Sequence, residues 1–312
     1  MKFLKKPYLL AAVYSVLLVS FTLFVVLDTF VISRTYAVVE DKSSVKDSGT
    51  GADSEGSSSN AGSGSGDAVT TENTYNDRNI NITITQYREY DTSIYVADVT
   101  LKSAQYLQTA FANSAYGKNV TQKTSAIAAE NGAILAVNGD FYGAQNRGYV
   151  IRNGVIYRDT VSGSSQEDQV IYEDGSFEII TEGSVSVSEL LEKGAVQVLS
   201  FGPGLVENGE VSVTSAEEVD KAKESNPRTA IGVIDALHYV LVVSDGRTGE
   251  STGLSLHELA EFMEGLGVTT AYNLDGGGSS AMYFNGGIVN NPTTDGRTIK
   301  ERSVSDIVYI GY

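Results

Sequence analysis

The sequence predicts an α+β domain with a mixed, largely antiparallel sheet and a few flanking helices, preceded by one transmembrane helix and a linker. Asn-Gly and Asp-Gly pairs separate short apolar runs, which is typical of hairpins. Helical periodicity is confined to a few segments. Composition changes abruptly twice before residue 79. The predicted divisions are therefore residues 1–33, a cytoplasmic tip with a transmembrane anchor, residues 34–78, a flexible linker, and residues 79–312, one domain.

The first segment has the length of a membrane-spanning helix. Lys2, Lys5 and Lys6 precede residues 7–27, which carry no charge. About 20 apolar residues span a bilayer, whereas the apolar part of a cleavable signal peptide is roughly 7–15 residues long, so an uncleaved anchor is favoured. The basic flank predicts a cytoplasmic N-terminus. A small-residue pattern ending at Ala37 leaves cleavage open, and either outcome predicts that the domain is extracellular, on a single-pass membrane protein.

Residues 41–76 are dominated by Ser, Gly, Asp, Asn and Glu and contain almost no large apolar side chain. Such a composition cannot bury enough apolar surface to offset the entropy of ordering the chain. A Gly- and Ser-rich chain of this length reaches tens of Å from its attachment point. We therefore predict that it is a tether between the membrane and the domain.

Three hairpins are predicted within the domain. Asn153-Gly154 separates residues 149–151 from 155–157, Asp174-Gly175 separates 170–172 from 177–180, and Asn208-Gly209 separates 205–206 from 211–213. Helices are expected at residues 103–115, 121–130, 188–193 and 255–265, the last with a capping box in Ser255 and Glu258. Apolar strands are expected at residues 133–137, 229–234, 239–243 and 307–310.

Composition excludes several classes of protein. The chain has no cysteine and two histidines, which disfavours a thiol nucleophile, a Ser-His-Asp triad and a histidine-rich zinc site. A formal net charge of −17 repels polyanions at long range, so no nucleic-acid partner is expected. An anionic substrate must instead be recognised by local arginines and backbone N–H groups.

The loop at residues 273–280, Asn-Leu-Asp-Gly-Gly-Gly-Ser-Ser, is the candidate binding loop. Glycines leave the backbone open to a ligand, and clustered N–H groups favour anions. Gly276, Gly277, Gly278, Ser279 and Ser280 are therefore candidate phosphate-binding residues. Asp275 is a candidate base, nucleophile or hydrogen-bond acceptor. An ordinary glycine-rich turn is the alternative, and the spacing is not that of a nucleotide-binding phosphate loop.

A second carboxylate follows the predicted strand 133–137. Asn138 and Asp140 come directly after this strand, and Phe141 and Tyr142 can form a wall against which a sugar stacks. Asp140 is accordingly a second candidate catalytic residue, and Asn138 a candidate binding residue. The alternative is that Asp140 only caps the turn.

Polar residues also adjoin two other predicted strands. Arg228 follows Pro227 and opens the strand 229–234, so its guanidinium starts from a restrained backbone and can hold two phosphate oxygens at once. Asp245 and Arg247 end the strand 239–243. We predict that all three bind substrate, although Asp245-Gly246 is also an ordinary turn pair and Arg228 is equally suited to a surface ion pair.

Four motifs, at residues 138–142, 226–232, 244–247 and 273–280, together resemble the phosphodiester glycosidase family, over roughly residues 80–312. The resemblance implies hydrolysis of a sugar-1-phosphodiester at the anomeric carbon, and it adds Arg302 as a binding residue by position. We expect an N-acetylhexosamine-type substrate in a cell-envelope glycan or exopolysaccharide, and no cofactor or metal.

The expected chemistry needs few residues. Ordinary glycosidases require a protonated carboxylic acid because the leaving alkoxide is strongly basic. A departing phosphomonoester is far less basic, with a pKa near ~6, so one carboxylate with arginine and N–H groups is sufficient. Two alternatives remain at this stage. One is a non-catalytic glycan-binding module, and the other is metal-dependent P–O cleavage with Asp140, Asp245 and Asp275 as ligands.

Overall fold

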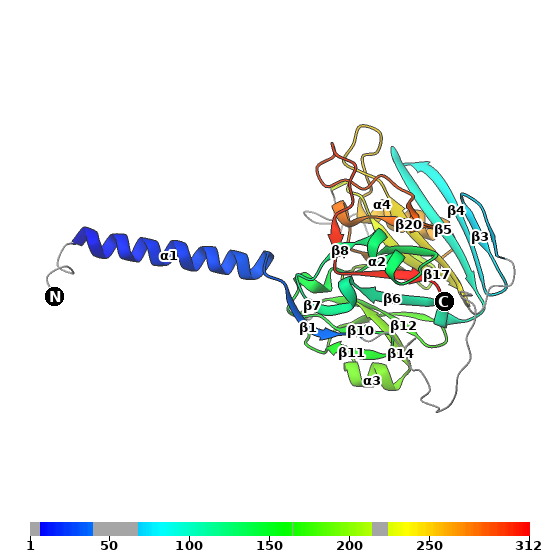
Figure 1. Cartoon of the computed structure of the whole chain (residues 1–312). Helices are drawn as coiled ribbons and strands as arrows, with labels where there is room; N and C mark the ends of the chain where they lie inside the picture. Colours follow the sequence, from blue (N-terminus) through cyan, green and yellow to red (C-terminus); the bar gives the residue numbers. More distant parts are fainter. Residues whose placement is uncertain (1–6, 40–67, 164, 214–223) are drawn as a thin grey trace, which may run out of the picture.

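A computed structural model of the chain describes residues 7–39, 68–163, 165–213 and 224–312. The long helix α1, Pro7–Phe30, projects away from a domain built mainly of strands (Figure 1). Residues 11–30 have a mean hydropathy of 2.1 and are long and apolar enough to cross a membrane. A signal sequence near an N-terminus meets the same criterion. The predicted apolar helix is thus present, and it extends three residues beyond residue 27.

The largest sheet has nine strands, and its neighbouring strands are antiparallel. In spatial order they are β16 (Glu210–Val211), β15 (Gly204–Glu207), β19 (Thr270–Leu274), β17 (Thr229–Asp235), β18 (His238–Ser244), β5 (Thr92–Leu101), β4 (Ile80–Glu89), β3 (Thr74–Asn76) and β2 (Val69–Thr70). Strand β17 pairs with both β18 and β19, so the start of β17 lies beside the ends of its two neighbours.

Two five-stranded sheets pack beside the large one. One contains β21 (Gly287–Ile288), β20 (Met282–Phe284), β9 (Leu135–Asn138), β23 (Asp306–Ile310) and β6 (Leu107–Phe111). The other contains β11 (Val155–Arg158), β10 (Val150–Arg152), β14 (Ala195–Leu199), β12 (Glu167–Tyr172) and β13 (Phe177–Thr181). Two-stranded pairs join β1 (Arg34–Val38) to β7 (Ala115–Lys118), and β22 (Ser303–Val304) to β8 (Gln122–Lys123).

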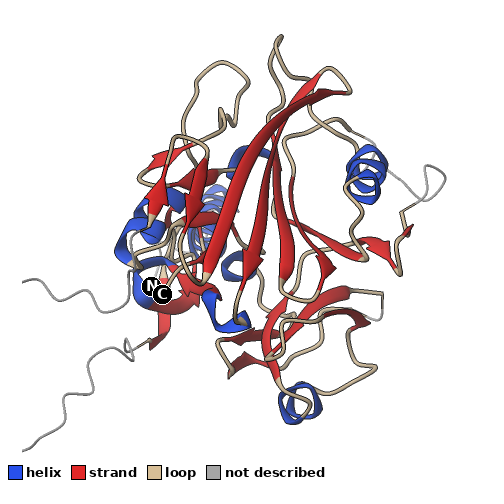
Figure 2. Cartoon of the chain, turned by 90° about the vertical axis from the view of Figure 1, so that its right-hand side faces the viewer, coloured by secondary structure: helices blue, strands red, loops and turns tan. Residues whose placement is uncertain are grey.

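The layers explain why the central strands are apolar on both faces. One face of the large sheet packs against both five-stranded sheets, with Val99, Leu241, Val137 and Leu199 in one core. The other face packs against α4, Leu256–Gly265, through residues such as Val242 and Phe262. Helices α2, Thr124–Glu130, and α3, Val187–Glu192, cover the outer faces of the smaller sheets. Figure 2 shows the long strands running through the middle of the molecule.

Most of the predicted elements are confirmed. The three hairpins form at β10–β11, β12–β13 and β15–β16. Asn153 and Asn208 have φ of 51° and 54°, as the Asn-Gly turns require. Helices α2, α3 and α4 correspond to three of the four expected helices, and the Ser255 and Glu258 capping box is present. The expected α+β class with largely antiparallel sheets is the one observed.

The helix expected at residues 103–115 is wrong. Only the short 3₁₀ turns η3, Ala104–Tyr106, and η4, Ala112–Ser114, are helical there, and β6 lies between them. Burial alternates along β6, with Leu107, Thr109 and Phe111 buried. Pairing with β23 satisfies the backbone of this segment. Tertiary strand pairing therefore overrides the moderate local preference for helix.

The ends of the predicted linker also differ from expectation. Strand β1 lies within residues 34–78 but pairs with β7 of the domain. Strands β2 and β3 lie in the same range and extend the edge of the large sheet. Residues 40–67 lie outside the described residues. Strands β1 and β2, on either side of this segment, are both paired with the domain, and the predicted tethering role of the segment stays a prediction.

Candidate active site

Several strand ends meet at one edge of the domain. Thr229 at the start of β17 is opposite Val243 near the end of β18 and Leu274 at the end of β19. The end of β9 joins the same group, because the Asp275 N–H donates to the Gly139 carbonyl at 3.1 Å. The structure therefore brings together the predicted residues Asn138, Asp140, Arg228, Asp245 and Asp275 from four strands.

Asp275 is nearly buried, with 8% of its surface exposed. Its Oδ2 lies 3.3 Å from Nη2 of Arg302, and the Arg302 Nε donates to the Ser279 hydroxyl at 3.0 Å. Burial raises the pKa of the Asp275 carboxyl, although the Ser279 hydrogen bond and the Arg302 charge act in the opposite direction. A carboxylate of raised pKa is a stronger base once it is ionised. Asp275 thus lies beside an arginine, Arg302.

Arg302 also connects Asp275 to a cavity. The side chain is 40% exposed, and it lines an open cavity of about 610 Å³. The other lining residues come from β8, from β22 and from the loop that precedes β22: Lys123, Thr294, Asp295, Thr298, Lys300, Glu301 and Ser303. Three of the lining side chains are basic, in a chain whose net charge is −17. The lining also contains Asp295 and Glu301, so one positive charge remains in excess, and Arg302 places a positive charge beside Asp275.

The three glycines of the loop are packed against protein atoms. A Cβ on Gly276 would lie 3.0 Å from the Pro227 carbonyl oxygen, and one on Gly277 would lie 2.9 Å from Nη2 of Arg247. A Cβ on Gly278 would overlap the Thr294 hydroxyl. Gly277 also has φ of 61°. These contacts explain the glycines without a ligand, because any side chain would displace a neighbouring segment.

The N–H groups of this loop are largely used within the protein. The Gly277 N–H donates to the Pro227 carbonyl at 2.7 Å, and those of Ser279 and Ser280 donate to carbonyls within the loop. Phosphate binding by these amides stays a prediction. The Ser280 hydroxyl is buried and has no hydrogen-bond partner among the described residues.

Asn138 holds the two ends of the loop in place. Its Nδ2 donates to the Asp275 carbonyl at 2.6 Å. Its Oδ1 accepts from the Thr229 hydroxyl at 2.8 Å and from the Ala281 N–H at 3.2 Å. The side chain is fully buried. These contacts favour a role for Asn138 in positioning Asp275 over the direct binding role that we predicted from the sequence.

Asp140 belongs to a buried ion cluster that the sequence analysis did not find. Its Oδ2 lies 2.8 Å from Nη2 of Arg152, which lies 2.8 Å from Oδ2 of Asp306. The exposed fractions of Asp140, Arg152 and Asp306 are 0%, 2% and 1%. Asp140 also accepts from the Ser200 N–H at 2.7 Å and from the Tyr142 N–H at 3.1 Å. A catalytic role for Asp140 stays a prediction, and these contacts favour a positioning role behind Asp275.

This cluster has one cation for two carboxylates. Burial and the neighbouring Asp140 raise the pKa of Asp306 to about 7, against the opposing effect of Arg152. A Cβ on Gly139 would overlap the Asp306 carboxylate, so Gly139 is required for its close approach. The signal that could have indicated the cluster is Arg152, a charged residue that directly ends an apolar strand.

The predicted aromatic wall is divided between two environments. Tyr142 is buried among Phe111 and Tyr116, with ring centroids 5.0 and 5.3 Å away. Phe141 is 38% exposed and has φ of 65°, a conformation that is unusual for a bulky residue. Only Phe141 therefore remains available for contact with a ligand at this loop.

Asp245 anchors the loop that follows β21. Its Oδ1 accepts from the Asn291 N–H at 2.8 Å and from Nδ2 of Asn290 at 3.2 Å. Its Oδ2 accepts from Nδ2 of Asn291 at 3.0 Å and from the Tyr95 hydroxyl at 3.3 Å. These four hydrogen bonds occupy the carboxylate, so a direct substrate contact stays a prediction.

The two arginines near Asp245 also contact protein carbonyls. Arg228 donates through Nε to the Leu254 carbonyl at 2.8 Å and through Nη2 to the Glu224 carbonyl at 3.0 Å. Arg247 donates to the Thr294 carbonyl at 2.8 Å and to the Asn226 Oδ1. Both arginines lie beside the glycine loop, and their binding of phosphate stays a prediction. Among the described residues no group of three or more His, Asp or Glu side chains has the arrangement of a metal site.

Comparison with known proteins bears on this arrangement. The family described as NAGPA, phosphodiester glycosidase, matches residues 131–311, which include Asp140, Arg152, Asp275, Arg302 and Asp306. The chain belongs to the phosphodiester glycosidase family. The match covers more than half of the chain and every site residue that the sequence predicted.

Individual relatives of this phosphodiester glycosidase chain are more distant. It is 27% identical over 204 residues to a Bacillus subtilis prophage protein, YomE, covering 64% of this chain and 31% of that one. It is 35% identical over 176 residues to human N-acetylglucosamine-1-phosphodiester alpha-N-acetylglucosaminidase, covering 51% of this chain and 33% of that one. The chain therefore spans about a third of the length of the curated relatives it matches.

Solved structures share the fold. The catalytic domain of the zebrafish N-acetylglucosamine-1-phosphodiester alpha-N-acetylglucosaminidase, in a form auto-inhibited by its pro-peptide, has a TM-score of 0.60 and 21% identity, covering 75% of this chain and 83% of that one. A hypothetical protein from Synechocystis has a TM-score of 0.54 and 16% identity, covering 74% and 62%. At these identities the likeness shows the fold alone.

A further buried carboxyl of this phosphodiester glycosidase chain leads to a pH prediction. Asp168 is fully buried. Burial and the neighbouring Glu182 raise its pKa to about 9. Because the folded state holds this proton more tightly than the unfolded state, the stabilising effect is full below the unfolded pKa of 3.8 and is lost as pH rises toward 9.

We expect Asp168→Asn to remove this loss, because the amide imitates the protonated carboxyl. Between pH 6 and pH 8 the free energy of unfolding of the wild type should fall relative to the variant by up to about 1.4 kcal/mol per pH unit. Urea unfolding at several pH values measures the difference. Parallel pH dependences of the two proteins would contradict the assignment, and the exposed Asp235→Asn serves as the matched control.

Proposed function

We propose that this chain hydrolyses a sugar-1-phosphodiester, of the N-acetylhexosamine type, at the bond between the anomeric carbon and the bridging oxygen. The observation that carries the proposal is the pairing of Asp275 with Arg302, which lines an open cavity, in a chain of the phosphodiester glycosidase family. A carboxylate beside an exposed guanidinium suits a substrate with an electrophilic carbon next to a phosphate.

Asp275 acts as nucleophile or activates water at C1 in this proposal. Arg302 contacts a non-bridging phosphate oxygen, and Lys123 and Lys300 add positive charge along the cavity. The departing phosphomonoester has a pKa near ~6, so the reaction does not depend on a second carboxyl group to protonate it. This fits a site in which Asp140 is buried against Arg152. Asp140 would then hold the loop that carries Asp275.

The proposal places the reaction outside the cytoplasm, on a cell-envelope glycan or an exopolysaccharide. Helix α1 would anchor the chain in the cell membrane, and the lysines at residues 2, 5 and 6 favour a cytoplasmic N-terminus. The high hydropathy of residues 11–30 supports an anchor. Single cysteines placed at exposed positions of the domain test this placement. In intact cells, a thiol reagent that does not cross the membrane should label them.

Isotope labelling tests which bond breaks. Turnover of an N-acetylhexosamine-1-phosphodiester in 18O-labelled water should place the label on the anomeric hydroxyl of the released sugar, because water or a carboxylate attacks C1. The sugar must be analysed before ring opening exchanges this oxygen. Mass spectrometry of both products measures the outcome. Label in the phosphomonoester would instead indicate attack at phosphorus.

Two controls separate the alternatives. A non-catalytic glycan-binding module would bind glycosyl phosphates without releasing sugar. Incubation with protein in excess over substrate detects even a slow release of sugar. A metal-dependent phosphodiesterase would lose activity in excess chelator and regain it with added metal. Full activity in chelator, with label on the sugar, is the expected result.

A further inference from the structure

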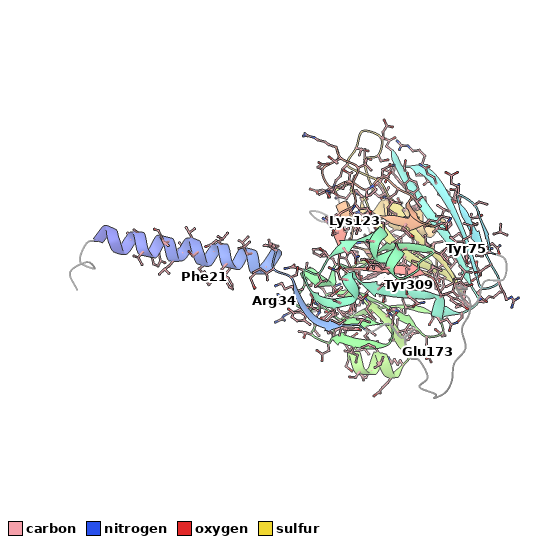
Figure 3. All side chains as sticks on the ribbon, in the orientation of Figure 1. Phe21, Arg34, Tyr75, Lys123, Glu173 and Tyr309 are labelled. Atoms are coloured by element: carbon pink, nitrogen blue, oxygen red, sulfur yellow. The ribbon has the colours of Figure 1, made fainter. Side chains whose placement is uncertain are left out.

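Helix α1 is joined to the first strand of the domain by a very short segment. Three residues separate Phe30 at the end of the helix from Arg34 at the start of β1. Strand β1 pairs with β7 from Arg34, opposite Lys118, to Val38, opposite Ala115. In Figure 3, Phe21 lies on the helix outside the domain, and Arg34 lies where the helix meets it. The helix and the domain therefore meet through a paired strand, which a free linker would not provide.

Asn119 stabilises the junction between α1 and β1 through hydrogen bonds. Its Nδ2 donates to the carbonyls of Thr29 and Ile32, both at 3.1 Å. The Ser33 hydroxyl donates to the Asn119 carbonyl at 2.8 Å. The last carbonyls of a helix have no partner within it, and here a side chain of the domain satisfies one of them. These hydrogen bonds fix the distance between the domain and the end of α1.

The same asparagine is close in the chain to the candidate active site. Its N–H donates to the Gly143 carbonyl at 2.9 Å, and Gly143 ends the loop in which Gly139 accepts from the Asp275 N–H. Four residues after Asn119, Lys123 pairs with Ser303 and lines the cavity with Arg302. Four residues span at most about 14 Å, so the cavity rim lies within about 14 Å of Asn119.

The face beside α1 carries features that suit a membrane surface. Arg34, which pairs with Asp28, lies where α1 meets the domain (Figure 3), and Lys123, four residues after Asn119, lines the cavity together with Arg302. Phe141 is exposed on the loop between Gly139 and Gly143. Cations and amphipathic aromatic side chains are favoured at the level of lipid headgroups. An active site at the level of the lipid headgroups can contact the phosphate of a lipid-linked sugar directly.

Resting on the proposed function, we propose that the substrate is a membrane-borne glycosyl phosphodiester whose phosphate carries a lipid. Water adds to C1, the bond between C1 and the bridging oxygen breaks, and that oxygen leaves with the phosphate. The products are a free sugar and a lipid monophosphate, and the proton from water passes to solvent. The sugar side of the substrate faces Asp275, and the phosphate contacts Arg302 at the rim that lies nearest to the bilayer.

The test uses the full chain in liposomes with two substrates that share one sugar-1-phosphodiester head. One carries a long-chain lipid in the same vesicles, and the other a short water-soluble alkyl group. In the lifted variant, a flexible insertion of twelve Gly and Ser residues lies between Ile32 and Ser33 and is combined with Asn119→Ala. The insertion allows the domain to move roughly 20 Å away from the end of α1 and therefore from the membrane. The matched control carries the same insertion between Gly64 and Ser65, which leaves β1 and its junction with α1 unchanged.

We expect the lifted variant to lose about tenfold or more of its rate on the lipid substrate, and less than about twofold on the soluble one, because the effective concentration of membrane-borne substrate falls. The control insertion should retain both rates. Equal rates of the lifted and wild-type chains on the lipid substrate would overturn the inference. Equal losses on both substrates would do the same. Absence of turnover of both substrates by the wild type would instead refute the proposed function.

Discussion

Replacement of Asp275 by Asn is expected to lower kcat by roughly 10³-fold or more while the fold is retained. The amide keeps the shape of the carboxyl but can neither attack C1 nor accept a proton from water. The neighbouring Arg302 would remain beside Ser279, because its Nε donates to the Ser279 hydroxyl. Initial rates on a soluble sugar-1-phosphodiester measure the effect, and substrate binding should change far less than turnover.

The variant is also expected to be at least as stable as the wild type. The raised pKa of Asp275 reflects the unfavourable burial of its charge, and the neutral amide removes that cost. Asp235→Asn makes the same change at the exposed end of β17 and should leave kcat unchanged. A kcat of the Asp275 variant within about tenfold of the wild type would move the catalytic role to another residue.

Replacement of Arg152 by Met is expected to destabilise the domain by about 3–5 kcal/mol. The change leaves the buried carboxyls of Asp140 and Asp306 side by side without their shared cation. At least one of them must then be protonated for the domain to fold. Urea unfolding at neutral pH measures the loss, and the loss should become smaller as pH falls and the carboxyls become protonated.

Two further variants make this prediction specific. Arg78→Met removes an exposed guanidinium from a turn and should change the free energy of unfolding by less than about 0.5 kcal/mol. Adding Asp306→Asn to Arg152→Met removes one of the two unpaired carboxyls and should recover part of the stability. No recovery in the double variant would show that Arg152 contributes through packing and its bond to the Val198 carbonyl, with little contribution from the ion cluster.

Local features were predicted well because their causes are local. The turn at Asn153 forms a hairpin because Asn and Gly accept the positive φ of a tight turn, and neither needs a distant partner. The capping box at Ser255 and Glu258 is similarly contained within four residues. The residues 107–111 show the limit of such reasoning, because their strand conformation depends on β23, about two hundred residues further along the chain.

The sequence by itself determined the apolar helix, the three hairpins, the α+β class and the set of strand ends that carry Asp140, Arg228, Asp245 and Asp275. Only the tertiary structure decided that Asp275 lies beside Arg302, which lines the cavity, and that the other three side chains contact neighbouring protein groups. Asp140 and Asp306 meet Arg152 across separations of 12 and 154 residues, and Asp275 meets Arg302 across 27. Turn and cap preferences act over a few residues, whereas these pairings form when separate sheets pack together and exclude water, so no local pattern specifies them.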